Sequence, residues 1–190
     1  MQKPANSSLL SLATLQLNRL RVIGILAAAG WLSLMTGCTT VAPTNSAAHS
    51  ITGRVISPTE IKSLHKKTVL GDNSYAEVNS AWLAQFNADF KSELHRLGIT
   101  KWDDRFDCNR FTDLYRSLAQ AHYFRVSFHR AIPAEALALG PIWYVRESSG
   151  RSHAIIQALT ERGRVFIEPQ TGKELVLSPR ELRSTFFAAM

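Results

Sequence analysis

The chain is poor in cysteine, in long apolar runs and in clustered charge. Its 190 residues include two cysteines, Cys38 and Cys108, which excludes a disulfide-rich scaffold and a four-cysteine zinc site. No apolar run reaches the roughly 20 residues that a membrane-spanning helix needs. Lys and Arg outnumber Asp and Glu 22 to 15, but they are scattered among the acids. Without a dense basic stripe, nothing in the sequence favours nucleic acid as a partner.

Apolar residues are abundant enough for one ordinary domain. They make up 45% of the chain, while 19% of the residues are charged, so the composition is not that of a disordered protein. The length also suits a single domain and leaves no room for a second one of normal size.

The first 37 residues are predicted to be a targeting segment. Cations precede an apolar run of 14 residues, Val22–Met35, which has the length of a signal-peptide core. The run ends in Leu34-Met35-Thr36-Gly37-Cys38, which resembles the bacterial lipobox. The resemblance implies that residues 1–37 are removed and that Cys38 becomes an acylated N-terminus, a lipid anchor in the membrane. An ordinary secretory signal and a retained anchor are the alternatives.

The residues after Cys38 predict a tether and a location. Thr39 stands where an aspartate would indicate retention in the inner membrane of enteric-type bacteria, so we expect the outer membrane, facing the periplasm. Residues 38–50 are small and polar, as in a flexible tether, and the folded domain is predicted over 51–190. Acylation of Cys38 leaves Cys108 as the remaining thiol, which is either buried and inert or reactive.

Three helices are predicted in the first half of the domain. Ser57-Pro58-Thr59-Glu60 is a capping box that starts a short helix. Apolar residues at spacings of three and four predict a long amphipathic helix over Glu77–Leu97, closed by Gly98. Asp107 can cap a third helix, which places Cys108 in its first turn.

Short segments rich in β-branched and aromatic residues follow Ala121 and predict strands. They are Tyr123–His129, Ile142–Arg146, Ala154–Leu159, Val165–Glu168 and Glu174–Leu177. Turns at residues 147–150 and 160–163 make the middle three an antiparallel meander, and a second capping box at Ser178 starts a final helix. Helices first and strands later predict an α+β domain, with N-terminal helices packed on an antiparallel sheet.

A thiol, an imidazole and a carboxylate follow one another in an order that suits nucleophilic chemistry. Cys108 at a helix N-terminus is favoured as a thiolate, the form that attacks. His153 could accept the thiol proton, and Glu168 could fix the imidazole tautomer. Pairing of the strands around the 160–163 turn would bring His153 and Glu168 side by side. Gln170 could donate a hydrogen bond to the same site or simply belong to a turn.

These segments resemble a known family. Asp107-Cys108-Asn109-Arg110-Phe111, Ser152-His153-Ala154 and the segment 166–172 are similar to the papain-like cysteine-protease domain of the mushroom-agglutinin C-terminal type. The resemblance implies a papain-like or transglutaminase-like core, with Cys108 as the nucleophile, His153 as the base and Glu168 as the carboxylate. It also implies a hydrolase that cleaves peptide or other amide bonds of a peptide or protein substrate through an acyl-enzyme. A transglutaminase-like variant would pass the acyl group to an amine.

A non-catalytic reading stays open beside the enzymatic one. In it, the chain is an envelope lipoprotein that uses the same fold as a binding or assembly module. No organic cofactor is expected. Asp103, Asp104 and Asp107 have the oxygen chemistry for Ca²⁺, and the resembling domain is linked to calcium, but three acids within five residues are a weak pattern for a metal site.

Overall fold

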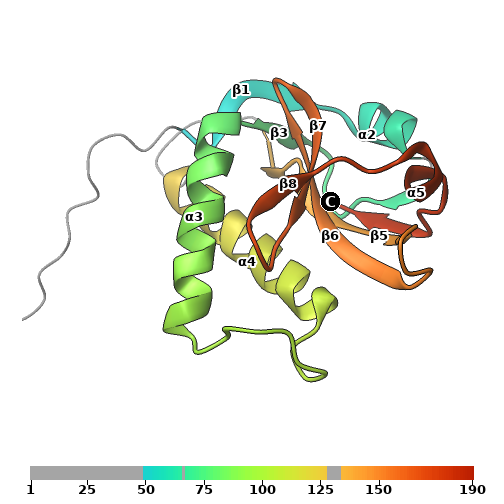
Figure 1. Cartoon of the computed structure of the whole chain (residues 1–190). Coiled ribbons are helices and arrows are strands. Elements are labelled where there is room, and N and C mark those ends of the chain that lie inside the picture. The colour runs from blue at the N-terminus through green and yellow to red at the C-terminus, as the bar shows by residue number, and fades with distance from the viewer. Residues whose placement is uncertain (1–48, 66, 128–133) are drawn as a thin grey trace, which may run out of the picture. The chain divides into compact units, whose positions relative to one another are not determined.

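The computed structural model describes residues 49–65, 67–127 and 134–190. Within these ranges, nine strands form one sheet and four helices surround it (Figure 1). The elements in chain order are β1 (Ile51–Ile56), α2 (Pro58–Leu64), β2 (Thr68–Val69), β3 (Tyr75–Val78), α3 (Ser80–Arg96), α4 (Cys108–Ser127), β4 (Ala136–Leu137), β5 (Leu139–Val145), β6 (Ser152–Thr160), β7 (Gly163–Glu168), β8 (Lys173–Leu175), α5 (Pro179–Arg183) and β9 (Phe187–Ala189).

Each helix begins at a side chain that accepts a hydrogen bond from its first turn. Ser57 accepts from the Glu60 amide before α2, and Asn79 accepts from the Trp82 amide before α3. Asp107 does the same for α4, because its Oδ1 lies 3.0 Å from the Asn109 nitrogen and 3.3 Å from that of Arg110. Ser178 forms a full capping box before α5. The predicted helix starts at Ser57, Asp107 and Ser178 are confirmed, whereas the long helix starts at Ser80 rather than Glu77.

The predicted meander of β5, β6 and β7 is confirmed. Antiparallel pairing of β5 with β6 runs from Leu139 opposite Ala158 to Val145 opposite Ser152. Strand β7 continues on the other edge of β6, with Ile156 opposite Ile167 and Thr160 opposite Gly163. The turns between them contain Gly150 and Gly163, whose positive φ values of 67° and 96° suit glycine.

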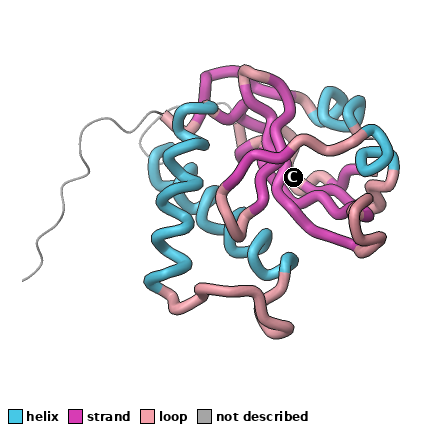
Figure 2. Tube along the Cα trace, viewed as in Figure 1, coloured by secondary structure: helices cyan, strands magenta, loops and turns pink. Residues whose placement is uncertain are grey.

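Both faces of this sheet are buried, and the side chains alternate between them. Ile156, Ala158 and Ile167 join a core with α3 and α4, the two long helices that lie beside each other (Figures 1 and 2). Ile155 and Phe166 point the other way and pack with Leu177 and Ala188. Because side chains alternate between the two faces along each strand, the sheet packs into one core on each face, and both faces carry apolar residues.

Strand β9 fits closely between β5 and β2. It pairs antiparallel with β5 and parallel with β2. A Cβ atom at Gly140 would lie 2.1 Å from the Ala189 carbonyl oxygen, so this approach requires a residue without a side chain.

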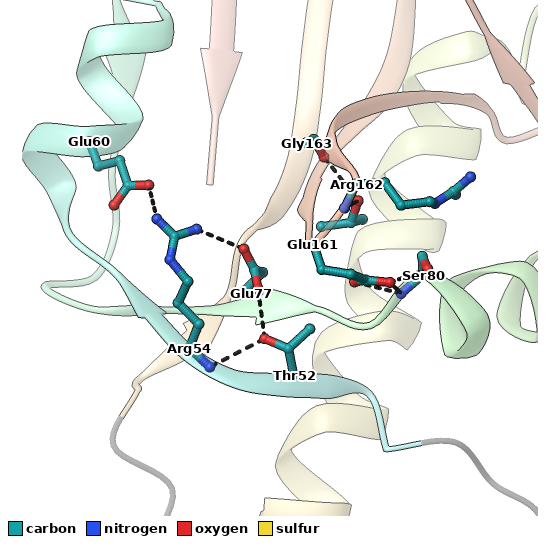
Figure 3. A network of polar contacts seen from close by, with 9 residues as sticks. Thr52, Arg54, Glu60, Glu77, Ser80, Glu161, Arg162 and Gly163 are labelled. Atoms are coloured by element: carbon teal, nitrogen blue, oxygen red, sulfur yellow. Dashed lines mark hydrogen bonds and ion pairs between the residues drawn. The ribbon is translucent and has the colours of Figure 1, made fainter.

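A polar network joins the first elements of the domain (Figure 3). Glu77 on β3 is buried, and its carboxylate accepts hydrogen bonds from Arg54 at 2.7 Å and Thr52 at 2.8 Å, both on β1. Arg54 also pairs with Glu60 on α2. In a second contact, the Glu161 carboxylate accepts a hydrogen bond from the Ser80 amide at the start of α3. Each contact links separate elements, and both carboxylate oxygens of Glu77 and of Glu161 accept a hydrogen bond.

The predicted fold class, helices packed on an antiparallel sheet in a papain-like core, is wrong. Three strands, β1 to β3, precede the first long helix, and the nine-stranded sheet is mixed, with parallel pairs between β2 and β9, β3 and β4, and β3 and β6. Strands β1 and β3 do not alternate between buried and exposed residues, since β1 is mostly exposed and β3 is buried throughout, and β2 has only two residues. The predicted strand over Tyr123–His129 is also wrong up to Ser127, because α4 continues that far on the apolar stripe that contains Tyr115, Ala119 and Tyr123.

The predicted signal peptide, the acylated Cys38 and most of the tether lie outside the described residues, so the lipid anchor stays a prediction. In the described ranges, no helix is both long and apolar enough to cross a membrane.

Candidate functional site

The first turn of α4 presents Cys108 to the start of β6. The Asp107 cap begins the helix one residue before Cys108, and this places the thiol at the helix N-terminus, partly exposed. The sulfur is hydrogen-bonded to His153, to the backbone N–H of Ala154 and, at 3.8 Å, to the Asn109 side chain. The helix and the strand therefore meet at this sulfur.

His153 and Glu168 come together because β6 and β7 pair. The pairs of β6 and β7 begin with Ile156 opposite Ile167, and Glu168 is the next residue of β7 toward the His153 end of β6. His153 Nε2 lies 2.7 Å from Glu168 Oε2, and both side chains are about nine-tenths buried. This contact leaves Nδ1 as the ring nitrogen for Cys108. The structure therefore brings all three of the predicted site residues together, while their roles stay untested.

Charge in this cluster is redistributed between thiol and imidazole. The hydrogen bond with His153 lowers the pKa of Cys108, against burial and the charge of Asp107, which raise it. Burial on its own lowers the pKa of His153, but the hydrogen bonds with Cys108 and Glu168 outweigh it and raise that pKa to about 9. Both shifts act in the direction of a thiolate beside an imidazolium. A thiolate is the nucleophilic form of cysteine, so this arrangement can react with electrophiles.

A groove of about 450 Å³ opens above the cluster. Its lining comes from the loop before α4, the β5–β6 hairpin and the end of β7. The lining residues are Trp102, Cys108, Arg146, Ser149, Arg151, Ser152, His153, Glu168, Gln170 and Thr171. Trp102 is 54% exposed, so an indole stands open to solvent at the same groove as the thiol.

Gln170 is placed by a tight turn after β7. The amides of Thr171 and Gly172 both donate to the Glu168 carbonyl, at 3.1 and 2.8 Å. Gly172 has a φ of 68°, a conformation that L residues with side chains rarely adopt. Gln170 lines this groove and a smaller neighbouring pocket, and its Nε2 is shielded from solvent and donates to no atom of the described residues. Glu168 Oε1 is shielded and unpaired in the same way.

The acids near Cys108 do not form a cation site. Asp103 is bonded through both carboxylate oxygens to Arg105. Asp107 Oδ1 accepts from the α4 backbone. Within the described ranges, no group of three or more His, Cys, Asp or Glu side chains is arranged to hold a metal ion.

Arg146 and Arg151 were missed by the sequence analysis. They flank the predicted turn at residues 147–150, so the turn pattern already placed them opposite each other at the hairpin base. Arg146 lies 3.3 Å from Glu168 Oε2, the oxygen that also contacts His153. Nothing in the sequence indicated that this hairpin would bend over Cys108, because that depends on how β6 meets α4.

Comparison with known proteins gives a fold likeness. No family model matches the chain, and no curated protein sequence is significantly similar to it. Two similar solved structures are the "PSL1a-E64 complex", at 18% identity and a TM-score of 0.52, and the Polyporus squamosus lectin bound to the human-type influenza-binding epitope Neu5Acα2-6Galβ1-4GlcNAc, at 19% and 0.54. Each match covers 72% of this chain and about half of the other chain, 50% and 49% respectively.

These neighbours correct the predicted family and function. The sequence analysis assigned the chain to papain-like cysteine peptidases and predicted a hydrolase, whereas the solved structures that share its fold are lectin structures. The assignment relied on three short segments around Cys108, His153 and Glu168. Such short segments report which side chains can meet, but by themselves they do not identify the fold that carries them. By fold, the chain is similar to about half of a lectin chain.

Proposed function

We propose that the chain is a ligand-binding module and that its ligand occupies the groove beside Cys108 and His153. The observation that carries the proposal is the groove of about 450 Å³ itself, whose walls bring a thiol, an imidazole and the guanidinium groups of Arg146 and Arg151 to one opening. Polar groups that converge on one groove are typical of a ligand site.

Two further features of the groove support binding. The exposed face of Trp102 offers a flat apolar surface of the kind on which ligand rings pack. The hydroxyls of Ser149, Ser152 and Thr171 add groups that can donate and accept. A few placed polar groups beside an aromatic wall are typical of small-molecule sites.

The test is a titration of the full-length chain with the sugar named with one of the similar structures, Neu5Acα2-6Galβ1-4GlcNAc. Isothermal titration calorimetry should show saturable binding of this probe. Trp102→Ala should weaken that binding by about tenfold, the size of a lost aromatic contact.

A matched control separates the groove from the rest of the surface. Phe186 is 45% exposed and does not line the groove, so Phe186→Ala should bind the probe like the unaltered chain. The proposal is wrong if the probe does not bind saturably, or if the Trp102 and Phe186 variants bind equally well.

A further inference from the structure

We infer that Cys108 is a site of reversible modification by small acidic disulfides, which form a mixed disulfide with its sulfur while Arg151 attracts their carboxylates. Three features of the groove lead to this assignment: the position of the thiol, the proton donor beside it and the unpaired guanidinium at the same opening. This chemistry goes beyond the proposed function and does not rest on it, because no other ligand takes part.

Cys108 is accessible from the groove and held as a nucleophile. The residue is partly exposed and lines a groove of about 450 Å³, a size that admits a small organic molecule. Its sulfur accepts a hydrogen bond from the backbone N–H of Ala154 and shares another with His153, both at the start of β6. These contacts stabilise the thiolate, which is the form of cysteine that exchanges with disulfides.

The exchange needs no oxidant other than the disulfide itself. The Cys108 thiolate attacks one sulfur of the disulfide, so a new S–S bond forms as the old one breaks. The second sulfur leaves with the electron pair of the broken bond and takes the proton held by His153, so it departs as a thiol. Cys108 is thereby oxidised, and one half of the small disulfide is reduced. Glu168, at 2.7 Å from His153 Nε2, orients the ring for this proton transfer.

Arg151 gives the groove a positive charge that no carboxylate of the described residues balances. Cys108 and His153 are neutral as a pair, whichever of them holds the proton, and Glu168 pairs with Arg146 at 3.3 Å. Arg151 is exposed, lines the groove and forms no ion pair with a described residue. It also stands opposite Arg146 at the hairpin base, where like charges repel. The groove therefore attracts a disulfide that carries carboxylates and repels one that carries amines.

The acids around the groove are held by other partners. Asp103 is bonded to an arginine of its own loop, and Asp107 caps α4 through Oδ1. Neither lines the groove. Glu147, in the same hairpin as Arg151, lies 3.5 Å from Arg180 on α5. A carboxylate on the incoming disulfide is therefore the available partner for Arg151, and a guanidinium binds a carboxylate through two parallel hydrogen bonds.

The mixed disulfide is expected to persist until a thiol is supplied from outside. Within residues 49–65, 67–127 and 134–190, no second cysteine is present to attack it. Release therefore requires an external thiol, which repeats the exchange in the opposite direction.

The experiment compares two disulfides of similar length and opposite charge. Dithiodipropionate carries a carboxylate at each end, and cystamine carries an ammonium at each end. Each is incubated at pH 7 with the reduced full-length chain, and mass spectrometry of the Cys108 peptide gives the rate of adduct formation. Each rate is divided by the rate of the same disulfide with N-acetylcysteine amide, an uncharged thiol, which removes differences in intrinsic reactivity. The normalised rate should be at least about tenfold higher for the dicarboxylate.

Two arginine variants locate the source of this preference. In Arg151→Gln the preference should fall to about twofold or less, because the unpaired charge is gone. Arg183→Gln is the matched control and should keep the preference. Arg183 is also exposed, lies on α5, forms no ion pair with a described residue and does not line the groove.

Each outcome decides one part of the assignment. If Cys108 forms no adduct with either disulfide, or if dithiothreitol does not remove the adduct, Cys108 is not a site of this modification. If cystamine reacts as fast as the dicarboxylate after normalisation, or if Arg151→Gln keeps the preference, the assignment of acidic disulfides to Arg151 is wrong. The sugar titration uses the reduced chain without any disulfide, so the proposed function stands or fails separately.

Discussion

Two clusters of charged residues in this domain differ in how completely they are satisfied. The first, Thr52, Arg54, Glu60 and Glu77, is called here the closed cluster, because both oxygens of the buried Glu77 accept a hydrogen bond. The second, Cys108, Arg146, His153 and Glu168, is called the groove cluster, because one buried oxygen of Glu168 has no partner.

The closed cluster serves to join elements of the fold, whereas the groove cluster lies where a ligand can approach. The closed cluster joins β1, β3 and α2, and its hydrogen bonds are all made within the protein (Figure 3). The groove cluster lies against a cavity, contains a thiol and an imidazole with shifted pKa values, and leaves hydrogen-bonding capacity unused. A buried polar group without a partner is costly, so the unpaired oxygen makes the groove cluster less favourable for stability than the closed cluster. Single substitutions in the two clusters and in the turn after β7 test this difference.

The largest effect is expected for the reactivity of Cys108. In the unaltered chain, the lowered pKa of the thiol keeps it ionised at pH values where an ordinary cysteine, with a pKa of about 8.5, is protonated. His153→Ala removes the main cause of that shift, so alkylation of Cys108 by iodoacetamide at pH 6 should slow by about tenfold to a hundredfold. Mass spectrometry of the Cys108 peptide over a range of pH measures the rate. An unchanged rate in the variant would contradict the thiolate–imidazolium pair.

The next effect is expected for stability in the closed cluster. Glu77→Ala removes two hydrogen bonds to a buried carboxylate and should lower the free energy of unfolding by about 2 kcal/mol. Glu60→Ala is the control, because its ion pair with Arg54 is exposed and should contribute less than about 1 kcal/mol. Urea unfolding of both variants gives the comparison. Equal losses would mean that burial of Glu77 does not distinguish this cluster.

A smaller effect is expected at the turn that places Gln170. Gly172→Ala puts a Cβ at a φ of 68° and 3.1 Å from the Asn87 carbonyl oxygen, so the free energy of unfolding should fall by about 1 to 2 kcal/mol. Gly98→Ala has a similar φ of 73° but meets no atom within 4 Å, and should therefore lose less. Unfolding in urea checks both. Identical values would show that the contact with Asn87 adds nothing to the backbone strain.

The smallest effect on Cys108 reactivity is expected for Glu168→Gln, which removes the charge that pairs with His153 and Arg146 but keeps an oxygen at the same place. The amide oxygen can still accept from the imidazole but supplies no charge, so Cys108 alkylation should slow less than in Glu168→Ala. The expected order of rates is the unaltered chain, then glutamine, then alanine. If both variants keep the full rate while His153→Ala loses it, Glu168 belongs to the turn alone.

The features that could be predicted from the sequence are those set by residues close together in the chain. Asp107 caps a helix through its own side chain, so the position of Cys108 at the helix start was predictable. The proximity of His153 to Glu168 was predictable because β6 and β7 pair around one short turn at residues 160–163.

The remaining parts depend on contacts between distant segments. The short strands β1, β2 and β9 have no sequence period of their own and form only against partners elsewhere in the sheet. The opposing pair Arg146 and Arg151 could be read from the turn, but its position over Cys108 depends on the packing of β6 and α4. The function was mispredicted for the same reason, because reactive residues were identified without the groove that surrounds them.

The pairing of β9 has a consequence for how the domain folds. Strand β9 is far along the chain from both of its partners, β5 and β2, and Thr68 of β2 stands opposite Ala188. Contacts between residues so far apart in sequence form slowly, since a long loop must close first. Until β9 arrives, one edge of β5 has no strand beside it and can pair with another chain. We therefore expect correct folding to be limited by the arrival of this three-residue strand, and truncations before Phe187 to favour aggregation.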